Sequence, residues 1–68
     1  MRILGIDPGT GICGFGVIEN NQAIDYGVIT TPPHTPLPDR LIDIYDSLHQ
    51  VIADNHPDVI AIEKLFFK

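Results

Sequence analysis

The chain has 68 residues, of which 44% are hydrophobic and 19% are charged, and this balance excludes an intrinsically disordered protein. A chain of this length forms one domain at most, and it buries only about 60% of its unfolded surface. Its formal net charge of −5 argues against a free-standing nucleic-acid-binding domain, which is usually basic, unless a basic surface lies outside this stretch.

The first element is an apolar run over residues 3–6, which predicts a buried β-strand. The strand ends in a carboxylate, Asp7, and an aspartate there is costly unless it binds something. Pro8 favours an extended conformation for Asp7, whereas Gly9 and Gly11 permit positive φ and the close approach of another group. Two interpretations stay open: an acidic metal ligand at the end of a sheet, or a turn aspartate that caps the Pro-Gly-Thr segment.

Two further strands are predicted over residues 14–19 and from residue 23 to about residue 30. Asn20 and Asn21 between them are a good two-residue hairpin signal, because asparagine tolerates left-handed conformations. The three strands therefore form an antiparallel meander. Four prolines mark residues 31–38 as a loop.

A helix is predicted after this loop, with Pro38 in its first turn and Asp39 complementing the helix dipole. Its apolar residues recur at steps of three and four and predict one stripe that packs on the sheet. The stripe comprises Leu41, Ile44, Tyr45, Leu48, Val51 and Ile52. We expect Asn55 to cap the C-terminus of the helix, and Pro57 forbids continuation.

The last element, residues 58–63, is another apolar run that ends in a carboxylate, Glu63. A strand that follows a helix and is apolar throughout is typical of parallel pairing, and a right-handed crossover places it beside the first strand. Asp7 and Glu63 then emerge at the same edge of the sheet, within reach of one divalent cation. The two carboxylates repel each other without a cation, and their hard oxygens suit Mg²⁺ or Mn²⁺.

The other charged residues indicate no second site. We expect Glu19, Asp25 and Asp58 to be solvated, because they lie at turns or at the starts of strands. Arg2 and Arg40 could contact phosphate, but two arginines do not make a basic groove. The lone cysteine cannot form an internal disulfide, and the sequence contains no secretory signal or membrane span, so we expect a cytoplasmic protein without a membrane partner.

Five segments occur in order along the whole chain: Gly5-Ile6-Asp7-Pro8-Gly9-Thr10, Gly14-Phe15-Gly16-Val17-Ile18, Leu37-Pro38-Asp39-Arg40-Leu41, Pro57-Asp58 and Ala61-Ile62-Glu63-Lys64-Leu65-Phe66-Phe67. Together they resemble the N-terminal part of a RuvC-type Holliday junction resolvase. The first segment alone is a weak signal, whereas its combination with the Ile-Glu strand is fairly specific.

The resemblance implies an α/β, RNase H-like mixed sheet, of which this chain is the N-terminal portion: a three-stranded antiparallel meander, one helix and one parallel strand. It also implies a homodimeric endonuclease that cuts four-way DNA junctions in recombination and repair, with the RuvA and RuvB branch-migration proteins as partners. The family uses two Mg²⁺ ions, for which Mn²⁺ can substitute, held by four catalytic carboxylates. Asp7 matches the first of these acids and Glu63 the second.

The end of the chain is aromatic, and Phe66 matches a residue that handles junction bases in the family, although a core ring is an equally good interpretation. Such an end leads us to expect a single, truncated nuclease domain over residues 1–68, without the last two acids. Two acids hold at best one ion loosely, so we expect this piece to be inactive, or nearly so, on its own.

The main alternative is a nucleotide-binding module of the actin, Hsp70 and sugar-kinase class, whose first strand also reads Gly-Ile-Asp followed by Gly-Thr. That fold shares the same sheet core, so the opening motif does not separate the two classes, whereas Glu63 favours the nuclease. Two further alternatives are an RNase H-like segment of a larger RNA-guided enzyme and a non-enzymatic remnant that only dimerises.

Overall fold

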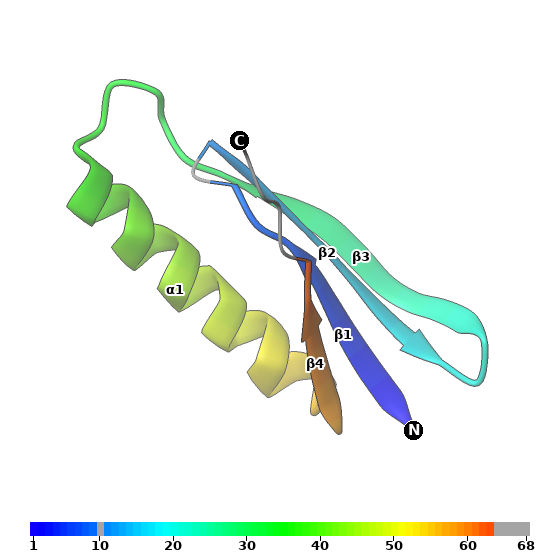
Figure 1. Cartoon of the computed structure of the whole chain (residues 1–68). Helices are drawn as coiled ribbons and strands as arrows, with labels where there is room; N and C mark the ends of the chain where they lie inside the picture. The colour runs from blue at the N-terminus through cyan, green and yellow to red at the C-terminus, as the bar shows by residue number, and fades with distance from the viewer. Residues whose placement is uncertain (10, 64–68) are drawn as a thin grey trace.

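The computed structural model describes residues 1–9 and 11–63, which form one sheet with a helix on one of its faces (Figure 1). The elements are β1 (Arg2–Asp7), β2 (Ile12–Glu19), β3 (Gln22–Thr30), α1 (Leu37–Asn55) and β4 (Val59–Ile62). The strand order is β3-β2-β1-β4. Strand β2 pairs antiparallel with β1 and β3, and β4 pairs parallel with β1, so the predicted arrangement is confirmed.

The hairpin between β2 and β3 forms where the sequence predicts it. Asn20 and Asn21 have φ angles of 52° and 67°, in the left-handed region that such a turn requires. Strand β2 begins at Ile12, two residues earlier than predicted, because Ile12 pairs with Thr30 and extends the ladder.

The core lies between α1 and one face of the sheet. Its buried hydrophobic residues are Leu4, Ile6, Cys13 and Val17, which occupy alternate positions of β1 and β2. The helix contributes Ile44, Leu48, Val51 and Ile52, most of the predicted stripe. The two other predicted members are exposed: Leu41 borders an open hollow beside β4, and Tyr45 lies at the margin of the stripe, against His49.

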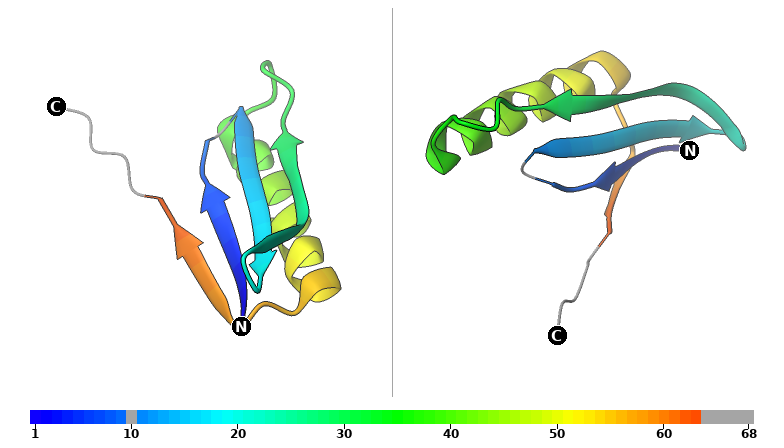
Figure 2. Two further views of the ribbon diagram at one scale, coloured as in Figure 1. Left: turned by 90° about the vertical axis from the view of Figure 1, so that its right-hand side faces the viewer. Right: turned by 90° about the horizontal axis from the view of Figure 1, so that it is seen from above.

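The other face of the sheet is covered by no described element (Figure 2). Residues that alternate with the core positions lie on this open face, among them Gly5 opposite Gly16 and Asp7 opposite Gly14. Several large apolar side chains are exposed there, namely Ile12, Ile18, Tyr26 and Val28. The open face is therefore apolar at its margins and lined by glycine in the middle.

The turn after β1 makes use of one of the two properties that glycine offers there. Gly9 and Gly11 permit a positive φ, but no described glycine adopts one. The close approach is confirmed, because a Cβ atom on Gly9 would overlap the carbonyl oxygen of Ile12. Glycine is needed here for space and not for an unusual backbone angle.

The C-terminus of α1 also differs from the expectation. The capping residue is His56, in the left-handed conformation with φ 50° and ψ 58°, and its N–H donates to the carbonyl oxygen of Ile52 at 2.9 Å. Asn55 is instead the last helical residue and is buried. Its side-chain amide donates to the carbonyl oxygen of Val51 at 3.0 Å within the helix and to Asp25 at 2.9 Å, and the bond to Asp25 links the end of α1 to β3.

Candidate metal centre

The two predicted acids lie at the ends of neighbouring strands: Asp7 is the last residue of β1, and Glu63 directly follows β4. In the parallel ladder, Ile3 lies beside Val59 and Ile6 lies beside Ile62. Asp7 and Glu63 are the next residues along these two strands, so they leave the sheet at the same edge, as the sequence predicts. Their role as metal ligands stays a prediction.

Both acids lie on the open face of the sheet. Ile6 is buried against α1, and the alternation of a strand therefore directs Asp7 to the other side. Ile62 borders the hollow beside α1, and Glu63 follows it on the open side. Asp7 and Glu63 are both exposed to solvent and both line one hollow with a volume of about 440 Å³.

The floor of this hollow is formed by residues of β1, β2 and β4, among them Ile6 and Ile62. Gly5, Gly14 and Ala61 line it together with the two acids. A Cβ atom on Gly14 would lie 3.8 Å from the Cβ atom of Asp7, so the space beside this carboxylate is open. A ligand can therefore approach Asp7 and Glu63 from the open face without displacing any described side chain.

The donor set suits a hard divalent cation. Carboxylate oxygens on rigid strand ends are the ligands that Mg²⁺ and Mn²⁺ prefer. Within residues 1–9 and 11–63, no three His, Cys, Asp or Glu side chains gather into a metal-binding group. The described part of the chain thus offers a pair of acids, which fits one cation and leaves coordination positions free. Phe66, predicted to contact DNA, lies outside the described residues.

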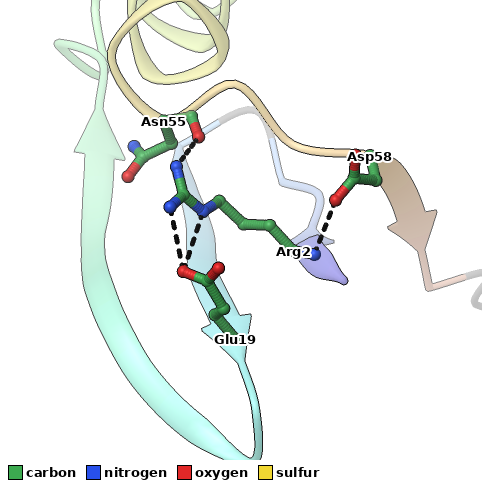
Figure 3. Close-up of polar contacts among 4 residues, drawn as sticks. All are labelled: Arg2, Glu19, Asn55 and Asp58. Atoms are coloured by element: carbon green, nitrogen blue, oxygen red, sulfur yellow. Dashed lines mark hydrogen bonds and ion pairs between the residues drawn. The ribbon is translucent and has the colours of Figure 1, made fainter.

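A polar cluster at the opposite end of β1 and β4 was missed by sequence reasoning (Figure 3). The Arg2 guanidinium donates to Glu19 Oε2 from Nη2 at 2.9 Å and from Nε at 3.2 Å, and Nη1 donates to the carbonyl oxygen of Asn55. The backbone N–H of Arg2 donates to Asp58 Oδ2 at 2.8 Å. With the bond from Asn55 to Asp25, all three acids expected to be solvated have protein partners.

Asp58 is exposed to solvent as expected, whereas the expectation is wrong for Glu19 and Asp25, which are half-buried because each lies opposite a donor on another element. Arg2 and Glu19 are paired residues of β1 and β2, where opposite charges attract across the strands. Counting along β1 and β2 from the pair Asp7–Gly14, next to the turn that joins these two strands, brings Arg2 opposite Glu19. That signal could have been used, whereas the bonds to Asn55 and Asp58 depend on where α1 and β4 dock.

Comparison with known proteins gives the family. The family model for crossover junction endodeoxyribonuclease RuvC matches residues 3–68. This chain belongs to the RuvC family. RuvC of Thermomicrobium roseum is 44% identical over 70 residues, which are 98% of this chain and 43% of that protein. RuvC of Alkaliphilus oremlandii is 51% identical over 71 residues, again 98% of this chain and 43% of that protein.

Solved RuvC structures have the same fold. Thermus thermophilus RuvC in complex with a Holliday junction substrate superposes with a TM-score of 0.89 at 30% identity, covering 100% of this chain and 45% of that one. A second structure of Thermus thermophilus RuvC gives a TM-score of 0.85, also at 30% identity, covering 98% of this chain and 45% of that one. The fold is therefore the RNase H-like fold of RuvC, and the nucleotide-binding alternative is not favoured. The chain spans less than half the length of these relatives.

Proposed function

We propose that this chain supplies the first part of the nuclease domain of a Holliday junction resolvase, a Mg²⁺-dependent endonuclease that hydrolyses phosphodiester bonds in four-way DNA. The observation that carries the proposal is the pair of acids, Asp7 and Glu63, at adjacent strand ends in a chain of the RuvC family. The relative whose structure contains a Holliday junction substrate supports this choice of DNA.

In this proposal, Asp7 and Glu63 are catalytic residues that hold the metal. When held by these two residues, a Mg²⁺ ion would lower the pKa of a water molecule and would stabilise the leaving oxygen of the phosphodiester. The protein would hold the two oxygen donors at the ends of β1 and β4, which backbone hydrogen bonds join up to Glu63. Asp7 would hold the ion from the central strand β1, whose Leu4 and Ile6 are buried, and Glu63 would hold it from the end of the edge strand β4.

Two acids complete only half of the four-carboxylate site that the family resemblance implies. We infer that the remaining acids come from sequence beyond this chain, and that the 68-residue piece alone does not cleave DNA. The homodimer, the RuvA and RuvB partners, the DNA contact of Phe66 and the cytoplasmic location belong to the same proposal. Among the residues that the structure describes, no helix has the length and apolar character needed to cross a membrane.

The test is cleavage of a labelled four-way DNA junction in Mg²⁺ by this chain and by a C-terminally extended protein. We expect cleavage by the extended protein only. Asp7→Asn and Glu63→Gln should each abolish cleavage and leave junction binding intact, because each removes a metal ligand and preserves shape. Asp46→Asn, on the exposed side of α1, is the matched control and should cleave normally.

Two outcomes contradict the proposal. Cleavage by the Asp7→Asn protein at the normal rate would show that the metal is held elsewhere. Magnesium-dependent ATP binding by a folded extended protein that cuts no junction would transfer the assignment to the nucleotide-binding class.

A further inference from the structure

We propose that Asp58 is a positioning residue of the metal centre. Together with the backbone of Arg2, it sets the register of β4 against β1 and thereby places Glu63 beside Asp7. The inference rests on the proposed function of Asp7 and Glu63 and adds a residue at the opposite end of β4 from Glu63.

Packing alone does not select this register. All four residues of β4 are apolar and all are exposed, so no alternation of polar and apolar positions distinguishes its two faces. Register is weakly specified in such a strand. A slip by one residue would turn Glu63 toward the α1 side of the sheet, and a slip by two would move it about 6.6 Å along the strand. Either slip would separate the two acids.

Asp58 makes a pair of hydrogen bonds with Arg2 that only the observed register permits. The N–H of Arg2 donates to Asp58 Oδ2 at 2.8 Å, and the N–H of Asp58 donates to the carbonyl oxygen of Arg2 at 2.8 Å. A slip in one direction would bring Pro57 to this position, and proline has no N–H to donate. A slip in the other direction would bring Val59, whose side chain accepts no hydrogen bond.

Arg2 is in turn held by two other elements, so it is a fixed reference for β4 (Figure 3). Its guanidinium bonds Glu19 on β2 and the carbonyl oxygen of Asn55 at the end of α1. The side chains of Arg2 and Glu19 are 32% and 35% exposed, so solvent screens their attraction. The contribution of this cluster is therefore mainly to orient the start of β1 and β4.

The test uses this chain with Mn²⁺ as the probe, and NMR spectroscopy as the main readout. Hydrogen exchange of the Glu63 amide, which donates to the carbonyl oxygen of Ile6, reports the last bond of the β1–β4 ladder. Paramagnetic broadening of the Asp7 and Glu63 signals by Mn²⁺ reports whether one ion senses both acids. The Mn²⁺ dissociation constant is measured by titration.

Three variants distinguish the role of the Asp58 side chain as a hydrogen-bond acceptor from the role of its negative charge. Asp58→Ala removes both, and Asp58→Asn removes the charge but keeps an oxygen that accepts from Arg2. Asp54→Asn removes a charge near the same end of α1, where the carboxylate accepts from Gln50 within the helix. In Asp58→Ala we expect exchange of the Glu63 amide about tenfold faster and Mn²⁺ binding at least about fivefold weaker. Asp58→Asn and Asp54→Asn should stay within about twofold of the original chain.

The outcomes distinguish the two proposals. If the original chain binds Mn²⁺ at Asp7 and Glu63 and Asp58→Ala leaves binding and Glu63 exchange unchanged, the positioning role is wrong. Equal acceleration of exchange in every strand of Asp58→Ala would also overturn it, because the effect would then be general instability. If Mn²⁺ broadens neither acid in the original chain, the proposed metal centre itself is wrong, whatever Asp58 does to exchange.

Discussion

The N–H of Glu63 donates a hydrogen bond to the carbonyl oxygen of Ile6 at 3.1 Å, and this bond ends the β1–β4 ladder. The bond links Glu63, directly after the edge strand β4, to Ile6, the residue before Asp7 in β1. The relative placement of Asp7 and Glu63 is therefore a property of the backbone of two strands. Only the side chains beyond the Cα atoms are then free to move, which is what the proposed metal site requires of two exposed carboxylates.

Filling the hollow beside Asp7 should weaken metal binding without unfolding the sheet. Gly14 is paired with Asp7 and lines the hollow, and valine there would place a branched side chain next to the carboxylate. We expect Gly14→Val to weaken Mn²⁺ binding by about tenfold and to leave stability unchanged or slightly raised, because valine favours a strand. Gly16→Val is the control, because a Cβ atom at Gly16 meets no atom within 4 Å and this residue does not line the hollow. Equal binding by both variants would show that the hollow is not the path of the ion.

Truncation of the buried leucine in β1 should have a large effect. Leu4 is fully buried in a core that contains few such residues, and Leu4→Ala should lower the free energy of unfolding by about 2–5 kcal/mol. For a domain of this size the total is only about 3–10 kcal/mol, so the variant should be close to unfolding. Urea denaturation followed by circular dichroism measures the change. Ile12→Ala, at a position that is 65% exposed, should cost less than about 1 kcal/mol.

The buried amide at the end of α1 should matter more than the charged residue beside it. Asn55→Ala removes the donor to Asp25 and to the carbonyl oxygen of Val51. We expect a loss of about 1–3 kcal/mol in the free energy of unfolding, because Asp25 is left without this partner in a half-buried position. Asp54→Ala, at an exposed position one residue earlier, should change stability by less than about 0.5 kcal/mol. Similar losses in the two variants would contradict the assigned role of Asn55.

The capping residue of α1 offers a stabilising change. His56 has a φ of 50°, in the region that disfavours side chains with a Cβ atom. His56→Gly should therefore raise the free energy of unfolding by about 0.5–1 kcal/mol, with a corresponding rise in Tm. His56→Val should lower it, since a β-branched residue tolerates this conformation least. A decrease in Tm for the glycine variant would indicate that the His56 side chain has a role of its own.

Local sequence pattern was enough to place the elements of this fold. Apolar runs located β1 and β4, the Asn20-Asn21 pair located the hairpin, and the spacing of apolar residues located α1. The acids at the ends of the two apolar runs were also visible, because each directly follows a run without charge, residues 3–6 and 59–62. Parallel pairing of β1 with β4 could be predicted from the helix that precedes β4, because a helical crossover brings the chain back so that the next strand runs in the same direction as β1.

Only the folded chain reveals what holds the start of these strands. Arg2 bonds residues 17, 53 and 56 positions away, and Asn55 bonds Asp25 from 30 positions away. Apart from the cross-strand pair of Arg2 and Glu19, no local pattern encodes such contacts, because they require the registers of all four strands and the end of a helix to be set at once. The sequence of β4 likewise does not specify its register, since every residue in this strand is apolar and no polar–apolar alternation marks its two faces. The position of Glu63 beside Asp7 is therefore decided by tertiary contacts at the far end of the strand, where hydrogen-bonding groups match in one register only.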